Sequence, residues 1–339
     1  MGTLWYSLVA LMVAGYVVLD GYDLGAGVIH LGIAKTDAER RQVIESIGPL
    51  WDGNEVFLIA LGGTLFFAFP RLYALSFSGF YLPLMIVLWL LIFRGMSVEF
   101  RSNVNDVAWR GFWDVVFTFA SGLLAVVFGV AIGNVIRGVN FDPSGTFFLP
   151  LWTNFGVAPP LGALDWYTGI VGVFSLAVMT LHGALWIALR TSGELQNRAR
   201  RSAAIAWPCV LVLGAVVTVL SFRLQPQILR NLAAAPWGAV FPALAVGGLL
   251  AARVASHRRH DHQAFLASSA AIAGMVASAA FGIYPYVLPS QLTIDNTLAG
   301  PHGLAIGIMW WAPGMLLAAL YIGYAHRVFS GKVPPSENR

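Results

Sequence analysis

Long apolar stretches, separated by short charged or Pro- and Gly-rich breaks, occupy almost the whole chain. A helix needs about 20 predominantly apolar residues to cross the hydrocarbon core of a bilayer. The pattern therefore predicts about nine transmembrane helices and an all-α integral membrane protein. The expected spans are residues 4–33, 49–70, 73–94, 113–136, 164–190, 203–222, 237–254, 263–284 and 304–327. The first follows no basic residue and precedes no small-residue cleavage site, so we expect a retained helix.

Basic residues are distributed unevenly between the two ends of these spans. Sixteen Lys and Arg residues fall on one side, whereas only Arg71, Arg137, Arg223 and Arg230 fall on the other. Because cytoplasmic loops carry an excess of Lys and Arg, we expect the sixteen on the inside. The N-terminus is then outside and the C-terminus cytoplasmic, which agrees with an odd number of spans.

Composition supports this class of protein. Hydrophobic residues make up 58% of the 339 residues and charged residues only 11%, whereas a soluble domain carries about 25% charged residues. We therefore expect one polytopic membrane domain over 1–339, with its longest connection at about 137–163 and a disordered tail at 334–339. The pI near 9.4 is ascribed to cytoplasmic loops and not to nucleic-acid binding. The single cysteine, Cys209, excludes an intrachain disulfide.

Carboxylates lie inside two of the expected spans. The first span holds Asp20 and Asp23, and the second holds Asp52 and Glu55. Residues three apart share one face of a helix, so each pair points to one side. A charge inside a bilayer costs about 2.5–3.5 kcal/mol on insertion scales, which makes these acids functional candidates. A rise of about 1.5 Å per residue places both pairs in the cytoplasmic half of the membrane.

Arg94, Glu99 and Arg101 lie at the inner end of the third span and are expected to complete a cluster with these acids. One interpretation is a buried ion-pair network that locks the first three spans together. The other is a proton-entry path, in which a carboxylate exchanges protons with a chain of water molecules. The residues alone leave both open, and the two are compatible.

Gly21 and Gly25 lie between and beside the first acidic pair. A Gly-rich phosphate loop would need a preceding strand and a following Lys-Ser or Lys-Thr, and neither occurs here. Small residues four apart on an apolar helix instead favour close packing against a second helix.

The histidines bear on haem binding. A b-type haem needs two axial side chains on facing helices at matched depth. Of the seven histidines, only His182 lies well inside an expected span, and no second ligand faces it. We expect His182 to be a hydrogen-bonded structural residue and the chain to bind no haem by itself.

Several sequence blocks resemble subunit II of the cytochrome bd-type quinol oxidases. They occur in the family's order and extend over nearly the whole chain: LDGYDLG (19–25), GPLWDGNEV (48–56), FSGFYLP (77–83), FRGMSVEFR (93–101), HGALW (182–186) and YPYVLPS (284–290). Two departures are Phe57, where many members have Trp, and the outer-loop segment 295–300.

The resemblance implies two four-helix bundles, over 1–136 and 164–284, and an extra helix at 304–327. It implies a partner, subunit I, that carries two b-type haems, a d-type haem and the quinol site. A small accessory single-helix subunit, and a quinone or lipid at the subunit interface, would fit the same family. The location would be a bacterial inner membrane, and the complex would reduce dioxygen to water with electrons from quinol.

Residue by residue, Asp52 matches the family carboxylate implicated in proton delivery, and Asp20 and Asp23 match its paired first-helix acids. Glu55 accompanies Asp52 on the same possible proton path. Arg94, Glu99 and Arg101 match charges that are expected to be structural. Two other functions remain for comparison: a proton-coupled secondary transporter and a purely structural scaffold subunit.

Overall fold

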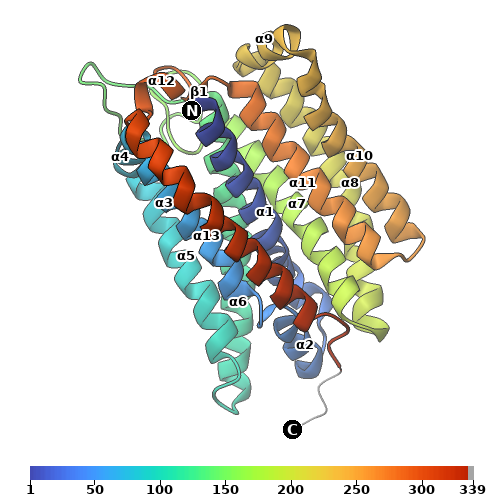
Figure 1. The fold of residues 1–339 in the computed structure, drawn as a ribbon. Helices are drawn as coiled ribbons and strands as arrows, with labels where there is room; N and C mark the ends of the chain where they lie inside the picture. Colours follow the sequence, from blue (N-terminus) through green and yellow to red (C-terminus); the bar gives the residue numbers. More distant parts are fainter. Residues whose placement is uncertain (335–339) are drawn as a thin grey trace.

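The computed structural model describes residues 1–334, in which long helices pack side by side (Figure 1). Within these residues, eight helices are long and apolar enough to cross a membrane, against about nine expected. They are α1 (Gly2–Ile33), α5 (Tyr81–Phe100), α6 (Val107–Arg137), α7 (Trp166–Arg190), α8 (Gly193–Leu224), α10 (Val240–His257), α11 (Asp261–Ile283) and α13 (Pro301–Val328). The tail expected at 334–339 falls, apart from Pro334, outside the described residues.

The second and third expected spans differ from the prediction. Helix α3 (Trp51–Ala68) has 18 residues, and polar side chains in its first two turns leave it less apolar than the eight. Pro70 then starts a separate short helix, α4 (Pro70–Gly79), because proline at the first helical position gives up no hydrogen bond. The span expected at 73–94 is consequently shifted along the chain to α5.

Short elements close the two ends of the helical body. At one end, α2 (Asp37–Ile47) begins with a capping box between Thr36 and Glu39. The other end holds five more elements: α9 (Gln227–Ala234), the 3₁₀ helix η1 (Pro236–Ala239), strands β1 (Tyr286–Leu288) and β2 (Leu292–Thr293), and α12 (Ile294–Thr297). The strands pair in antiparallel fashion. The long connection between α6 and α7 packs Phe147 and Leu149 against Leu288 and Leu292 of this hairpin.

Helix α1 is the central element and packs against α3, α6, α7 and α11. At the crossing of α1 and α7 the two backbones touch, and a Cβ on Gly25 would overlap Met179 and Gly183 of α7. Only glycine allows this approach, which brings the first and second halves of the chain into direct contact. The division into two four-helix bundles remains a prediction.

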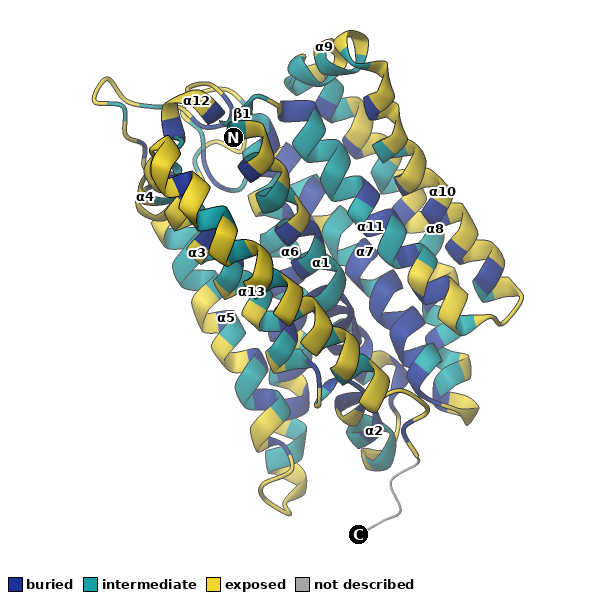
Figure 2. Ribbon diagram, viewed as in Figure 1, coloured by how far each residue is buried: buried dark blue, intermediate teal, exposed yellow. Residues whose placement is uncertain are grey.

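Exposure follows the expected membrane setting. The outward surfaces of α5, α8, α10 and α13 carry many exposed residues, whereas buried residues concentrate along α7 (Figure 2). The start of α1 and the end of α13 lie at opposite ends of the molecule (Figure 1). The basic residues expected inside gather, as far as they are described, at the end that holds α2. Which end faces the cytoplasm remains a prediction.

Candidate functional site

A buried guanidinium joins the first and second acidic pairs. Arg94 of α5 is 1% exposed, and its Nη1 donates to Oδ1 of Asp20 at 2.6 Å. Its Nη2 pairs with Glu55 of α3. The other oxygen of Asp20 accepts from the Tyr16 hydroxyl at 2.9 Å. We call Asp20, Asp23, Glu55 and Arg94 the Arg94 cluster, and it connects α1, α3 and α5.

Asp23 belongs to the same cluster, but its carboxyl group forms no ion pair with any residue in 1–334. Its side chain is fully buried, and its Oδ2 accepts from Asn54 Nδ2 at 2.8 Å. Asn54 also donates to the Tyr22 hydroxyl at 2.7 Å. Within the described residues, Oδ1 of Asp23 has no hydrogen-bond partner. An unpartnered buried carboxyl oxygen is costly, so Asp23 stays a functional candidate.

A small cavity adjoins the cluster on its α6 and α7 side. Its volume is about 30 Å³, and Tyr16, Asp20, Gly21 and Met179 contribute to its lining. Apart from Tyr16, Asp20 and Ser175 the lining is apolar, so Asp20 borders a small and mostly apolar space between α1, α6 and α7.

Asp52 and Glu99 do not join the cluster. Asp52 lies in the first turn of α3 and is exposed, and within residues 1–334 no hydrogen bond or ion pair engages its side chain. Glu99 is also exposed, near the end of α5. Glu55 contacts Arg94 of α5 and the neighbouring Asn54 contacts α1, whereas Asp52 takes part in neither of these contacts.

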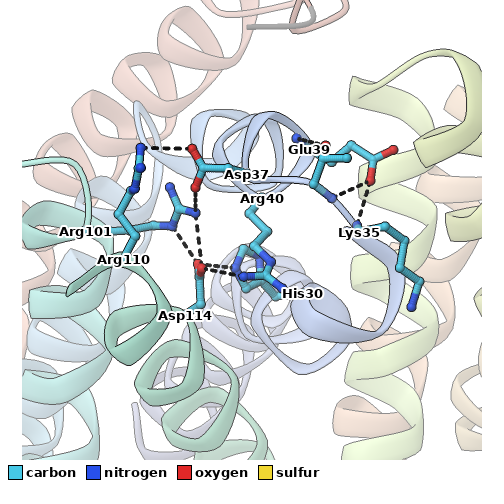
Figure 3. Close-up of polar contacts among 9 residues, drawn as sticks. His30, Lys35, Asp37, Glu39, Arg40, Arg101, Arg110 and Asp114 are labelled. Atoms are coloured by element: carbon cyan, nitrogen blue, oxygen red, sulfur yellow. Dashed lines mark hydrogen bonds and ion pairs between the residues drawn. The ribbon is translucent and has the colours of Figure 1, made fainter. Parts of the chain in front are cut away.

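A second polar cluster lies at the α2 end and centres on Asp114 of α6, which is 1% exposed (Figure 3). His30 Nε2 of α1 lies 2.6 Å from Oδ1 of Asp114. Arg101, at the end of α5, donates to the same oxygen from Nε at 2.6 Å and to Oδ2 from Nη2 at 3.1 Å. Arg40 of α2 adds a contact of 3.3 Å to Oδ2.

Asp37 extends this second cluster towards the surface. It accepts from Arg101 at 2.7 Å and from Arg110 at 3.1 Å (Figure 3). The Asp114 cluster, which we define as His30, Asp37, Arg40, Arg101, Arg110 and Asp114, thus ties α1, α2, α5 and α6 together. Arg101 belongs here and not with Arg94, which divides the single cluster expected from sequence into two.

Sequence reasoning missed Asp114 and His30. The fourth span was expected to begin at residue 113, which placed Asp114 at its edge. In the structure α6 begins at Val107, and Asp114 lies two turns inside it. Asp20 was a candidate because it is an acid inside a span, and Asp114 meets the same criterion once α6 begins at Val107. Its spacing of four residues from Arg110 also suggested a polar face at this end of the helix.

His182 occupies a fully buried position between three helices. Its Nδ1 lies 2.7 Å from the Ser268 hydroxyl of α11, and its Nε2 lies 3.0 Å from the Val18 carbonyl oxygen of α1. The ring stacks on Phe265 at 4.8 Å. Both nitrogens are engaged by the protein, so this geometry leaves none for a haem iron. In residues 1–334, no three His, Cys, Asp or Glu side chains are grouped so that they could hold a metal ion.

Known proteins resemble this chain over nearly its full length. The family model described as cytochrome bd terminal oxidase subunit II matches residues 1–329. Cytochrome bd-I ubiquinol oxidase subunit 2 of Escherichia coli K12 is 31% identical over 365 residues, covering 97% of this chain and 94% of that protein. Cytochrome bd ubiquinol oxidase subunit 2 of Bacillus subtilis is 32% identical, with 89% and 88% covered.

A solved structure shares the fold. A chain of the bd oxidase from Geobacillus thermodenitrificans superposes with a TM-score of 0.77 at 19% identity, covering 97% of this chain and 98% of that one. The family match over residues 1–329 and the identities above 30% together establish the relationship. The chain belongs to the cytochrome bd terminal oxidase subunit II family.

Proposed function

We propose that this chain is the haem-free subunit II of a quinol oxidase and that it relays cytoplasmic protons through Asp52 and the Arg94 cluster. As a family member it is a subunit of a quinol:oxygen oxidoreductase. The haems, which would carry electrons to dioxygen, belong to the partner subunit. Both ring nitrogens of the buried His182 are hydrogen-bonded within the chain, which supports a structural role for this histidine.

The charge balance of the Arg94 cluster is the observation that supports a role in proton transfer. Asp20, Asp23 and Glu55 supply three carboxyl groups, and Arg94 is the guanidinium that contacts two of them. With all three acids ionised, the cluster would hold a net charge of −2, and within it only the Glu55 side chain is partly exposed. Burying uncompensated charge is very costly, whereas two bound protons make the cluster neutral. A group of acids that holds protons at rest can receive and release them during turnover.

Asp52 is suited to be the entry point because it is exposed, while Glu55, one turn further along α3, has a side chain 23% exposed and contacts Arg94. A proton that enters at Asp52 thus has a carboxyl acceptor on the same helix. The residue beside Asp52, Gly53, faces Tyr321 of α13. We propose that the haem-bearing subunit borders this side of α3 and α13 and keeps Asp52 in contact with cytoplasmic water, since an acid left against lipid would be costly.

The deciding experiment replaces Asp52 with Asn in the intact, haem-loaded complex. Removing a proton-transfer group should lower quinol-driven oxygen uptake by about 10²-fold, the lower end of general acid–base effects. Glu45→Gln is the matched control, because Glu45 is an exposed acid on α2 outside both clusters. Haem spectra of both variants report whether assembly is intact.

Unchanged turnover in Asp52→Asn with full haem content would refute the relay. Loss of haem from that variant would favour the scaffold function instead. The Asp114 cluster gives the scaffold a specific basis, because its ion pairs join four helices without needing to move protons. The two functions are tested at different residues, the relay at Asp52 and the scaffold at the Asp114 cluster.

A further inference from the structure

A basic groove lies between α8 and α10, and none of its lining residues belongs to either cluster. It is formed by the start of α8, the end of α10 and the turn that follows, at the end of the molecule that also holds α2 (Figure 1). Its volume is about 420 Å³, within the range of about 300–1,000 Å³ typical of ligand pockets. Four arginines line it, namely Arg200, Arg201, Arg253 and Arg259.

Most of this positive charge is not neutralised by the protein. Arg200 is matched by Asp261, to which it donates at 3.0 and 2.7 Å. Within the described residues, no ion pair engages Arg201, Arg253 or Arg259. Glu194 is the acid among the lining residues. The groove therefore has an excess of positive charge that a ligand with negative charge would balance.

One of these arginines is held in place by an aromatic side chain. The guanidinium of Arg253 lies over the Trp207 ring, 5.8 Å from its centroid. Trp207 is itself fixed, because its indole nitrogen donates to the Leu249 carbonyl oxygen of α10 at 2.8 Å. Arg253, about one turn before the end of α10, is thus held against the middle of α8.

The groove continues directly into apolar surface. Further along α8, Ile205 and Val212 are 70% and 61% exposed, and on α10 Val246 and Val254 are 54% and 50% exposed. Helices α8 and α10 lie at the outer edge of the molecule, and exposed residues recur along their length (Figure 2). An anion with long hydrocarbon chains would satisfy both the arginines and this surface, whereas a free ion would satisfy only the arginines.

We infer that the groove binds the phosphodiester headgroup of an anionic phospholipid, with its acyl chains along α8 and α10. Basic pockets between transmembrane helices near the inner membrane surface are suited to such headgroups. The guanidinium supplies paired donors that match phosphate oxygens. The site lies outside the proposed proton path, so it can be tested independently of that path.

The test measures phosphatidylglycerol binding to the intact oxidase complex by native mass spectrometry after lipid exchange, with phosphatidylcholine as the neutral comparison. The variant is Arg201→Gln with Arg253→Gln. Each basic residue near the membrane surface strengthens anionic-lipid binding about fivefold, so removal of two should weaken it about 25-fold. Arg258→Gln is the matched control, since Arg258 is exposed on the same turn but does not line the groove.

The expected result is selective loss of phosphatidylglycerol in the double variant, with haem spectrum and turnover unchanged in both variants. Inorganic phosphate at buffer concentrations should not displace the lipid. Displacement by phosphate would overturn the lipid assignment in favour of a free anion. Equal loss in Arg258→Gln would overturn the groove in favour of general surface charge. A protein segment seated on the groove in the complex, with no lipid retained, would overturn it as well.

Discussion

Asp20 and Asp23 lie one turn apart on α1 and meet different partners: Asp20 accepts a hydrogen bond from Arg94, and Asp23 accepts one from Asn54. The sequence presents them as an equivalent pair on one helix face. The docking of α5 supplies a cation to one of them, and the docking of α3 supplies an amide to the other. This difference predicts different consequences when each acid is neutralised.

Asp20→Asn removes a partner from a buried ion pair and leaves Arg94 with Glu55 alone. Breaking a buried pair in this way costs about 3–5 kcal/mol. We expect a lower thermal unfolding midpoint of the complex and loss of haem content, measured by calorimetry and by absorbance. Retention of the wild-type midpoint would show that the pair between Asp20 and Arg94 does not stabilise the fold.

Asp23→Asn should act differently. The new side-chain oxygen can still accept from Asn54, so the unfolding midpoint should stay close to that of the wild type. A carboxyl group that stores a proton is lost, so oxygen uptake should fall while haem content is kept. Full activity in a stable Asp23→Asn complex would remove Asp23 from the proton path and leave the role of Asp52 untouched.

Asp114→Ala tests the second cluster. The substitution leaves His30 and Arg101 buried without their shared carboxylate, for which we expect a loss of about 3–5 kcal/mol in stability. Release of α2 should accompany it, measured as faster proteolysis within residues 34–50. Glu99→Gln is the control on exposed surface and should change stability by no more than about 0.5 kcal/mol. Equal proteolysis rates in the two variants would contradict the role assigned to Asp114.

Gly25→Ala tests the contact between α1 and α7. The added methyl group would overlap the backbone of α7 and force the helices apart, at a cost of about 1–3 kcal/mol or more. The matched control is Gly32→Ala on the same helix, where a Cβ meets no atom within 4 Å. Yield and unfolding midpoint of the complex should fall for Gly25→Ala only. Similar values for both variants would show that the helices are not in close contact.

The ionisation of Glu39, which lies outside the membrane spans, should make the stability of the protein depend on pH. Partial burial opposes ionisation, but hydrogen bonds from Lys35 and Thr36 and the pair with Arg198 outweigh it, so the pKa of Glu39 lies below its ordinary value of 4.5. A lowered folded-state pKa stabilises the protein above the unfolded-state pKa. This stabilisation is lost as the pH falls through the folded-state pKa.

The measurement compares unfolding midpoints of the wild-type and Glu39→Gln complexes as a function of pH. The wild type should be more stable at neutral pH, and the gap should close as the pH falls below 4.5. The difference in midpoint is expected because Glu39 is part of the cap at the start of α2, which the substitution by Gln weakens. A gap that stays constant over this range would show that ionisation of Glu39 does not contribute.

Features that depend on a single segment of the chain, such as the length of an apolar stretch, can be predicted well from sequence. Apolar length indicates a spanning helix wherever it occurs, and seven of the eight candidate spans overlap closely with expected ones, while α5 is shifted. The shift has a local cause that was overlooked, namely Pro70 and the break around Phe80. The family resemblance was likewise visible in short ordered blocks and was confirmed by the match over residues 1–329.

The sequence by itself determined the membrane class, most helix positions, the family and the presence of costly acids in the first half of the chain. Only the tertiary structure decided which acids act together: Glu55 and not Asp52 contacts Arg94, and Arg101 contacts Asp114, which the sequence analysis had passed over. The reason is physical. Helical periodicity fixes the face on which a side chain lies, but its partner is fixed by the docking of other helices, and that depends on contacts between residues far apart in the chain.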